Sequence, residues 1–90
     1  MSIKVNILPY LQYLTGGKTM VEVEGGTIAR CLDGLTSQFP GLRTVLFDSN
    51  GKLLDYVDIY VNGESRYYEG LARPVQEGDE LHIILIIAGG

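Results

Sequence analysis

The chain ends in two glycines, Gly89 and Gly90, so its last chemical group is a carboxylate carried on a thin backbone. Glycine has no Cβ and accepts any φ, which lets such a terminus pass close to the walls of another protein's active site. A carboxylate is a poor electrophile and must first become an acyl derivative with a good leaving group. The ending therefore indicates a terminus on which a second protein acts. The alternative is an ordinary frayed end, since 12 of the 90 residues are glycine.

Other residues that could do chemistry have simpler structural interpretations. Cys31 is the only cysteine, and it falls on the apolar stripe of a predicted helix, so we expect it in the core. His82 has no second His or Cys at ligand spacing, so we assign it to the solvent face of a strand. Glu77 and Asp79-Glu80 are typical of a solvated turn before a strand. The sequence thus predicts no metal site, no bound cofactor and no hydrolytic acid pair.

Length and charge limit the kind of protein. Ninety residues suit a single domain, residues 1–90, with one hydrophobic core. Seven Lys and Arg against 11 Asp and Glu give a formal charge of -4, and no basic stripe is present, which argues against nucleic acid and anionic membranes as partners. An acidic protein favours partners with a basic surface. No apolar run is long enough to span a bilayer, and no secretory signal is visible, so we expect a cytoplasmic protein.

The first half of the chain shows two strand patterns and one helix pattern. Apolar residues alternate with polar ones from Ser2 to Ile7, and Pro9 should end this strand. Alternation returns over residues 18–24 after a glycine turn, which predicts a hairpin. Residues 27–39 then carry apolar side chains at helical spacing, and Thr27 is a suitable N-cap.

The second half begins with a less regular segment. Residues 42–56 predict a short helical turn and a covering loop. Residues 57–61 alternate as a third strand, and Asn62-Gly63 then predicts a tight turn. Tyr67-Tyr68 suggests a short edge strand, and a last strand begins at Glu80. This order predicts an α+β fold of the β-grasp (ubiquitin-like) type, with one main helix across a mixed sheet of four to five strands.

The chain resembles the MoaD/ThiS family of ubiquitin-like sulfur carriers over essentially its whole length. The residues that carry the resemblance are Ile59-Tyr60-Val61-Asn62, the run from Val75 to Leu81, and Ala88-Gly89-Gly90. The chain is similar to the longer members, because residues 42–56 exceed what a minimal thiamine-type carrier has. Molybdopterin-type members have prolines before the final residues, where this chain has Leu85-Ile86-Ile87.

The resemblance implies a reaction cycle centred on Gly90. An adenylating, E1-like activating enzyme would use ATP to adenylate the Gly90 carboxylate, and a sulfur donor would convert it into a thiocarboxylate, with Gly89 supplying clearance. The chain would be a protein co-substrate rather than an enzyme, and could be the small subunit of a synthase such as molybdopterin synthase. A sulfur-accepting synthase or thiolation enzyme would be its second partner. The receiving pathway stays open among molybdopterin, cysteine, thiamine and other products.

Two further functions remain open at this point. The first is a ubiquitin-like modifier that is conjugated through Gly90 to lysines of target proteins, using the same adenylation. The second is a plain interaction module in which the terminal glycines are incidental.

The last strand carries apolar residues on both of its faces. Leu81, Ile83, Leu85 and Ile87 form one row, and Ile84 and Ile86 form a second. One helix covers only one face of a sheet, so one row should remain open. We predict that Ile84 and Ile86, with Tyr60, form a patch that docks the partner enzymes, and that Ile87 and Ala88 extend it into the tail. The alternative is that residues 42–54 or a second copy of the chain cover this face.

Overall fold

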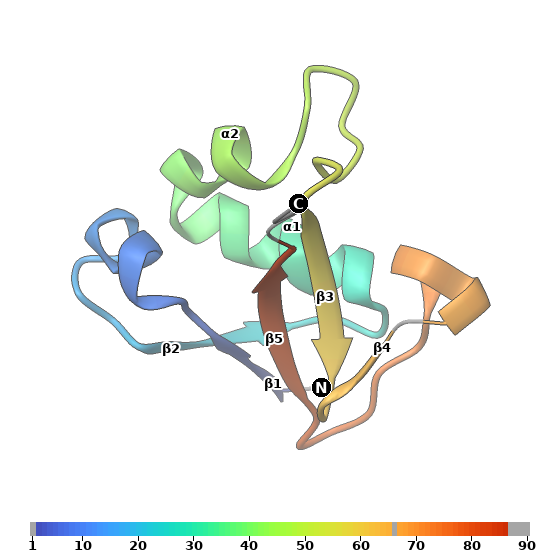
Figure 1. The fold of residues 1–90 in the computed structure, drawn as a ribbon. Coiled ribbons are helices and arrows are strands. Elements are labelled where there is room, and N and C mark those ends of the chain that lie inside the picture. The colour runs from blue at the N-terminus through green and yellow to red at the C-terminus, as the bar shows by residue number, and fades with distance from the viewer. Residues whose placement is uncertain (1, 66, 87–90) are drawn as a thin grey trace.

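A computed structural model describes residues 2–65 and 67–86 of the chain. Its strands form one mixed sheet in the order β2-β1-β5-β3-β4, with the main helix α1 across one face (Figure 1). The strands are β1 (Ser2–Asn6), β2 (Met20–Glu24), β3 (Val57–Val61), β4 (Glu64–Ser65) and β5 (Glu80–Leu85). The helices are α1 (Ile28–Gln38) and α2 (Arg43–Leu46), with three 3-10 turns, η1 (Pro9–Leu14), η2 (Pro40–Leu42) and η3 (Tyr67–Ala72). The arrangement is the predicted β-grasp.

The last strand lies in the middle of the sheet. β5 pairs parallel to β1, with Val5 opposite Leu81, and antiparallel to β3, with Ile59 opposite Ile83. β1 and β2 form the predicted antiparallel hairpin. Because β5 is hydrogen-bonded along both edges, the segment that leads to the C-terminus starts from the central strand of the sheet.

The core lies between the sheet and α1. Alternate strand residues such as Ile3, Val5 and Ile83 are buried against the apolar stripe of the helix. Thr27 caps α1 as predicted, since its hydroxyl oxygen accepts a hydrogen bond from the Arg30 N–H at 3.2 Å. Cys31 is fully buried in this core, which confirms the structural assignment.

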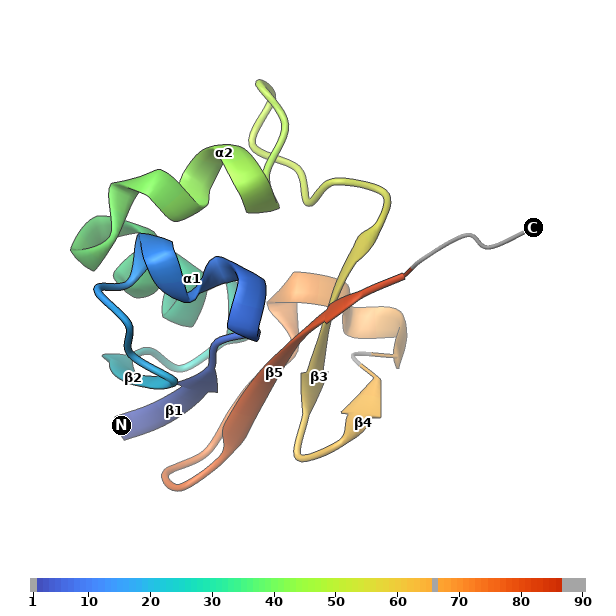
Figure 2. The same cartoon turned by 60° about the vertical axis from the view of Figure 1, so that its left-hand side comes forward.

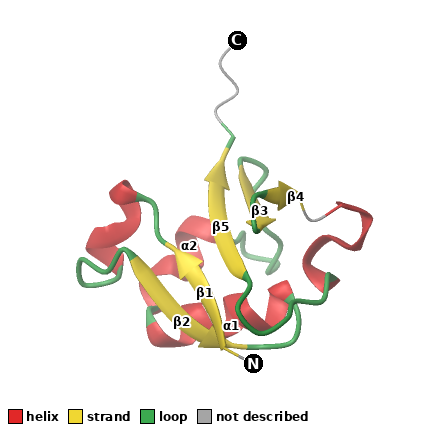
Figure 3. Ribbon diagram, turned by 90° about the horizontal axis from the view of Figure 1, so that it is seen from below, coloured by secondary structure: helices red, strands yellow, loops and turns green. Residues whose placement is uncertain are grey.

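Residues 42–54 pack on the helix side of the sheet. Leu42 and Leu46 are buried in the core, and a turn held by the Asp48 carboxylate follows α2. Figure 2 shows α1 and α2 on the same side of β5, and Figure 3 shows the opposite face of the sheet in front of the helices. The helical turn is confirmed, and the alternative in which this segment covers the open face is wrong.

The edge strand predicted at Tyr67-Tyr68 is wrong. Asn62 and Gly63 have φ of 52° and 85°, which makes a two-residue hairpin turn, so the chain pairs again at once as β4. Within the described residues β4 consists of Glu64 and Ser65, and the tyrosines begin η3 instead. The first hairpin also differs, because its connection contains η1, whose Leu11 is buried in the core.

Candidate functional site

The predicted reactive terminus follows directly from β5. The Ile86 N–H donates to the Tyr56 carbonyl at 2.8 Å, which extends the pairing one residue beyond the strand. Residues 87–90, including the predicted site residues Ile87, Ala88, Gly89 and Gly90, lie outside the described part of the chain. Four residues can span at most about 14 Å when fully extended. The carrier body must therefore come within that distance of the place where Gly90 reacts.

The two apolar rows of the last strand separate onto opposite faces. Leu81 and Ile83 are buried in the core, whereas Ile84 is half-buried on the face that α1 leaves open and Ile86 is 51% exposed. Leu85 packs partly against the core. The structure thus places Ile84 and Ile86 where the sequence predicts an open row.

Tyr60 joins these residues on the open face. It lies opposite His82 in the pairing of β3 with β5, so Ile84 is its diagonal neighbour, and Asp58 lies directly opposite Ile84. We call Tyr60, Ile84 and Ile86 the docking patch. Nearer the start of β5 the same face is polar, where the Asn6 amide reaches the Glu80 carboxylate at 3.4 Å. The apolar part of this face therefore lies toward the end from which the tail departs.

Three exposed tyrosines, two in η1 and one just before β3, were not predicted as site residues. Tyr10 is 55% exposed, Tyr56 is 51% exposed and Tyr13 is 74% exposed. Burial raises the pKa of Tyr10, and the neighbouring phenols of Tyr56 and Tyr13 raise it further. The sequence indicates these tyrosines only indirectly. If the first and last strands are parallel neighbours, Tyr10 and Tyr13, which follow the first strand, lie at the same end of the sheet as the residues that follow the last strand.

Asn62 and Asp79, which lie in the segments that carry the family resemblance, form hydrogen bonds that stabilise the fold. The Asp79 carboxylate accepts hydrogen bonds from the Gln76 N–H at 2.8 Å and from the Asn62 amide at 3.0 Å. The Asn62 side-chain oxygen in turn accepts from the Glu80 N–H at 2.9 Å. These bonds join the β3–β4 turn to the start of β5, so they fix the strand that carries the tail.

Among the described residues, Cys31 and the other possible metal ligands form no second site. Burial raises the pKa of Cys31, which keeps the thiol protonated and unreactive inside the core. Among residues 2–65 and 67–86, no three His, Cys, Asp or Glu side chains form a group that could hold a metal ion. In the same described ranges, no helix is long and apolar enough to cross a membrane.

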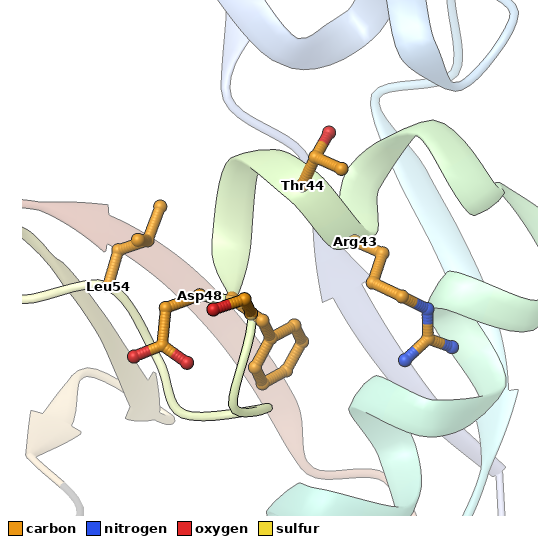
Figure 4. A pocket seen from close by; sticks show the side chains of 6 residues that line it. Arg43, Thr44, Asp48 and Leu54 are labelled. Carbon is orange, nitrogen blue, oxygen red and sulfur yellow. The ribbon is translucent and has the colours of Figure 1, made fainter.

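A hollow of about 520 Å³ lies beside α2, on the helix side of the molecule (Figure 4). The Arg43 guanidinium donates to the Thr36 hydroxyl at 3.0 Å, and the Asp48 carboxylate holds the following turn. Figure 4 shows Arg43 and Asp48 turned to opposite sides of the hollow. Because each serves local structure and they do not converge, this hollow is not a catalytic site.

Comparison with known proteins places the chain in context. A family model described as the ThiS family matches residues 5–90. The sulfur carrier protein CysO of Mycobacterium tuberculosis is 37% identical over 93 residues, covering 100% of both chains. Small archaeal modifier protein 1 of Haloferax volcanii is 32% identical over 82 residues, covering 89% of this chain and 91% of that protein. The solved BexX/CysO complex of Amycolatopsis orientalis contains a chain that matches with a TM-score of 0.86 and 35% identity, over 98% of this chain and 99% of that one.

Proposed function

The chain belongs to the ThiS family, and we propose that it is a sulfur carrier whose Gly90 carboxylate is activated and then converted into a thiocarboxylate. The single observation that carries this function is the 37% identity, over the full length of both chains, to the sulfur carrier CysO. The carrier is a protein co-substrate of its activating enzyme and catalyses nothing itself. Because activation consumes ATP, we place it in the cytoplasm.

Activation and sulfur loading are two displacement steps on Gly90. The Gly90 carboxylate attacks the α-phosphorus of ATP, which forms an acyl-adenylate and releases pyrophosphate. A sulfide sulfur then attacks the acyl carbon, so that a C–S bond forms and the bond to AMP breaks. Gly89 supplies the clearance that the activating enzyme's channel requires.

The docking patch supports the proposal that partner enzymes bind this chain. A tail of four residues can reach a buried active site only if the carrier body docks at its entrance. Tyr60, Ile84 and Ile86 lie on the face that α1 leaves open, toward the end from which the tail departs, which suits that contact. We propose that an adenylating, E1-like enzyme and then a sulfur-accepting enzyme bind this patch in turn, while Ile87 and Ala88 enter the channel. The solved BexX/CysO complex shows that a similar carrier chain binds a partner protein, which supports docking of this kind.

Intact-mass measurement tests the sulfur-carrier function. The purified chain is incubated with ATP, sulfide and the activating enzyme from the same cell, and a mass gain equal to the replacement of one oxygen by one sulfur is expected. A chain without Gly89 and Gly90 is the control and should gain nothing. If the intact chain forms neither adenylate nor thiocarboxylate with an enzyme that turns over another carrier, the proposal is wrong.

The docking patch has a separate test. Ile84→Glu places a carboxylate opposite Asp58 on the open face, where solvent can hydrate it, so the protein should still fold. Adenylation should then fall sharply, because the charge must be desolvated at the interface. If the folded variant is adenylated as well as the unchanged carrier, the patch does not dock the enzyme.

Conjugation to other proteins is the second candidate function. The 32% identity to small archaeal modifier protein 1 favours it, and conjugation uses the same activated carboxylate. Adducts between Gly90 and lysines of other proteins, detected by peptide mass spectrometry in cells, would support this function. Their absence in cells that load the carrier with sulfur would exclude it.

A further inference from the structure

Exposed aromatic side chains gather around the point where the tail leaves the sheet. Among the side chains that the structure describes, the large apolar or aromatic ones that are strongly exposed are Tyr10, Tyr13, Met20, Tyr56 and Ile86. Tyr10 and Tyr13 belong to η1, Tyr56 directly precedes β3, and Ile86 directly follows β5. An exposed aromatic cluster of this kind marks an interaction surface more often than it serves the fold.

The topology of the sheet brings these segments together. β1 is parallel to β5, with Asn6 opposite His82, so η1 follows β1 at the end of the sheet where β5 finishes (Figure 3). On the other side, the Ile86 N–H is bonded to the Tyr56 carbonyl. Tyr10, in the turn that follows β1, and Tyr56, the residue before β3, therefore lie on opposite sides of the end of β5.

The turn that carries Tyr10 and Tyr13 is firmly held. Leu11 is buried in the core, and the Gln12 amide donates to the Ile7 carbonyl at 3.1 Å. A rigid aromatic ring loses little conformational entropy on binding, which makes such positions efficient contacts.

The charge around the tyrosines selects one kind of partner. Residues 8–14, 54–58 and 84–86 contain the carboxylates of Asp55 and Asp58 and no Lys, Arg or His. Tyrosine faces beside carboxylates suit a guanidinium group, which stacks on rings and pairs with acids. A second copy of the chain is disfavoured, because each copy carries a net charge of -4.

We propose that Tyr10, Tyr13 and Tyr56, the tyrosine collar, receive arginine side chains of the activating enzyme at the entrance to its tail channel. This inference rests on the proposed function. The docking patch lies on one face of the sheet, whereas the collar reaches both sides of the tail root. Contacts at both places fix the direction in which the tail enters, and they strengthen carrier binding.

Steady-state ATP–pyrophosphate exchange at varied carrier concentration tests the collar. The double variant Tyr10→Leu/Tyr56→Leu keeps apolar bulk but removes both π faces, so the KM for the carrier should rise about tenfold. Tyr10→Phe/Tyr56→Phe keeps the faces and should stay within about twofold of the unchanged carrier. Because these side chains are exposed, all variants should fold, which thermal unfolding checks.

Two variants that each remove one negative charge complete the test. Asp55→Asn should raise KM and flatten its dependence on salt, whereas Asp33→Asn, an equal charge change on the exposed side of α1, should do neither. Equal KM values for the Leu and Phe variants would overturn the collar, as would a dimer that the Leu substitutions dissociate. If the unchanged carrier supports no exchange at all, the proposed function fails instead.

Discussion

Truncating Ile86 to Ala should weaken docking without unfolding the carrier. Complete burial of an isoleucine side chain stabilises by about 1.5–3 kcal/mol relative to exposure. Ile86 is 51% exposed in the free chain, so docking can bury roughly half of this, and alanine keeps part of it. The expected loss is about 1 kcal/mol, or roughly a fivefold rise in the KM for the carrier. The fold should persist, because the bond from Ile86 to Tyr56 is a main-chain bond.

ATP–pyrophosphate exchange with the activating enzyme measures this effect. The KM for the carrier should rise while kcat stays unchanged, since the side chain contacts the enzyme equally before and during adenylation. Met20→Ala is the matched control, because Met20 is 39% exposed on the edge strand β2, which β1 separates from β5. The reasoning is refuted if folded Ile86→Ala has an unchanged KM, or if Met20→Ala raises KM equally.

Three predictions concern the stability of the fold. Loss of the bond between the Asn62 and Asp79 side chains should lower the free energy of unfolding by about 1–2 kcal/mol, in Asp79→Ala and in Asn62→Ala alike. A double-mutant cycle measured by urea unfolding should give a coupling above about 0.5 kcal/mol. Additive effects would contradict a bond between the two side chains. Gly25→Ala should lower the free energy of unfolding, since a Cβ there would lie 2.8 Å from the Cys31 nitrogen. Gly34→Ala meets only ordinary contacts and should raise the free energy of unfolding by about 0.5–1 kcal/mol. A change of the same sign for both variants would refute this prediction. Burial raises the pKa of Cys31, so the thiol contributes to stability below its ordinary pKa, and this contribution is lost as pH rises above that value. Between neutral and alkaline pH, the free energy of unfolding should therefore fall less in Cys31→Ala than in the unchanged chain. Equal losses in the two proteins would contradict this prediction.

Most local elements of this protein follow from its sequence. Alternation predicts β1, β2 and β3, because a strand with one buried face must alternate, and an apolar run that follows a turn predicts β5. Thr27 predicts the start of α1, because its hydroxyl satisfies a backbone N–H that has no helical partner. The terminal glycines predict an activated carboxylate, because a backbone without Cβ atoms suits passage into another protein's channel. The two apolar rows of the last strand predict an open patch at Ile84 and Ile86, and the structure places both on the open face.

Tertiary structure decided the features that depend on contacts distant in sequence. Tyr67-Tyr68 has the composition of a strand, but the tight turn at Asn62-Gly63 places the paired residues earlier, at Glu64–Ser65. Tyr10 and Tyr56 are unremarkable in the sequence, and they flank the tail only because β5 lies between β1 and β3. That strand order is set by burial of the whole core against one helix, which no local pattern encodes. The sequence by itself predicted a reactive terminus, whereas the packing of the sheet determined which side chains surround the end of β5.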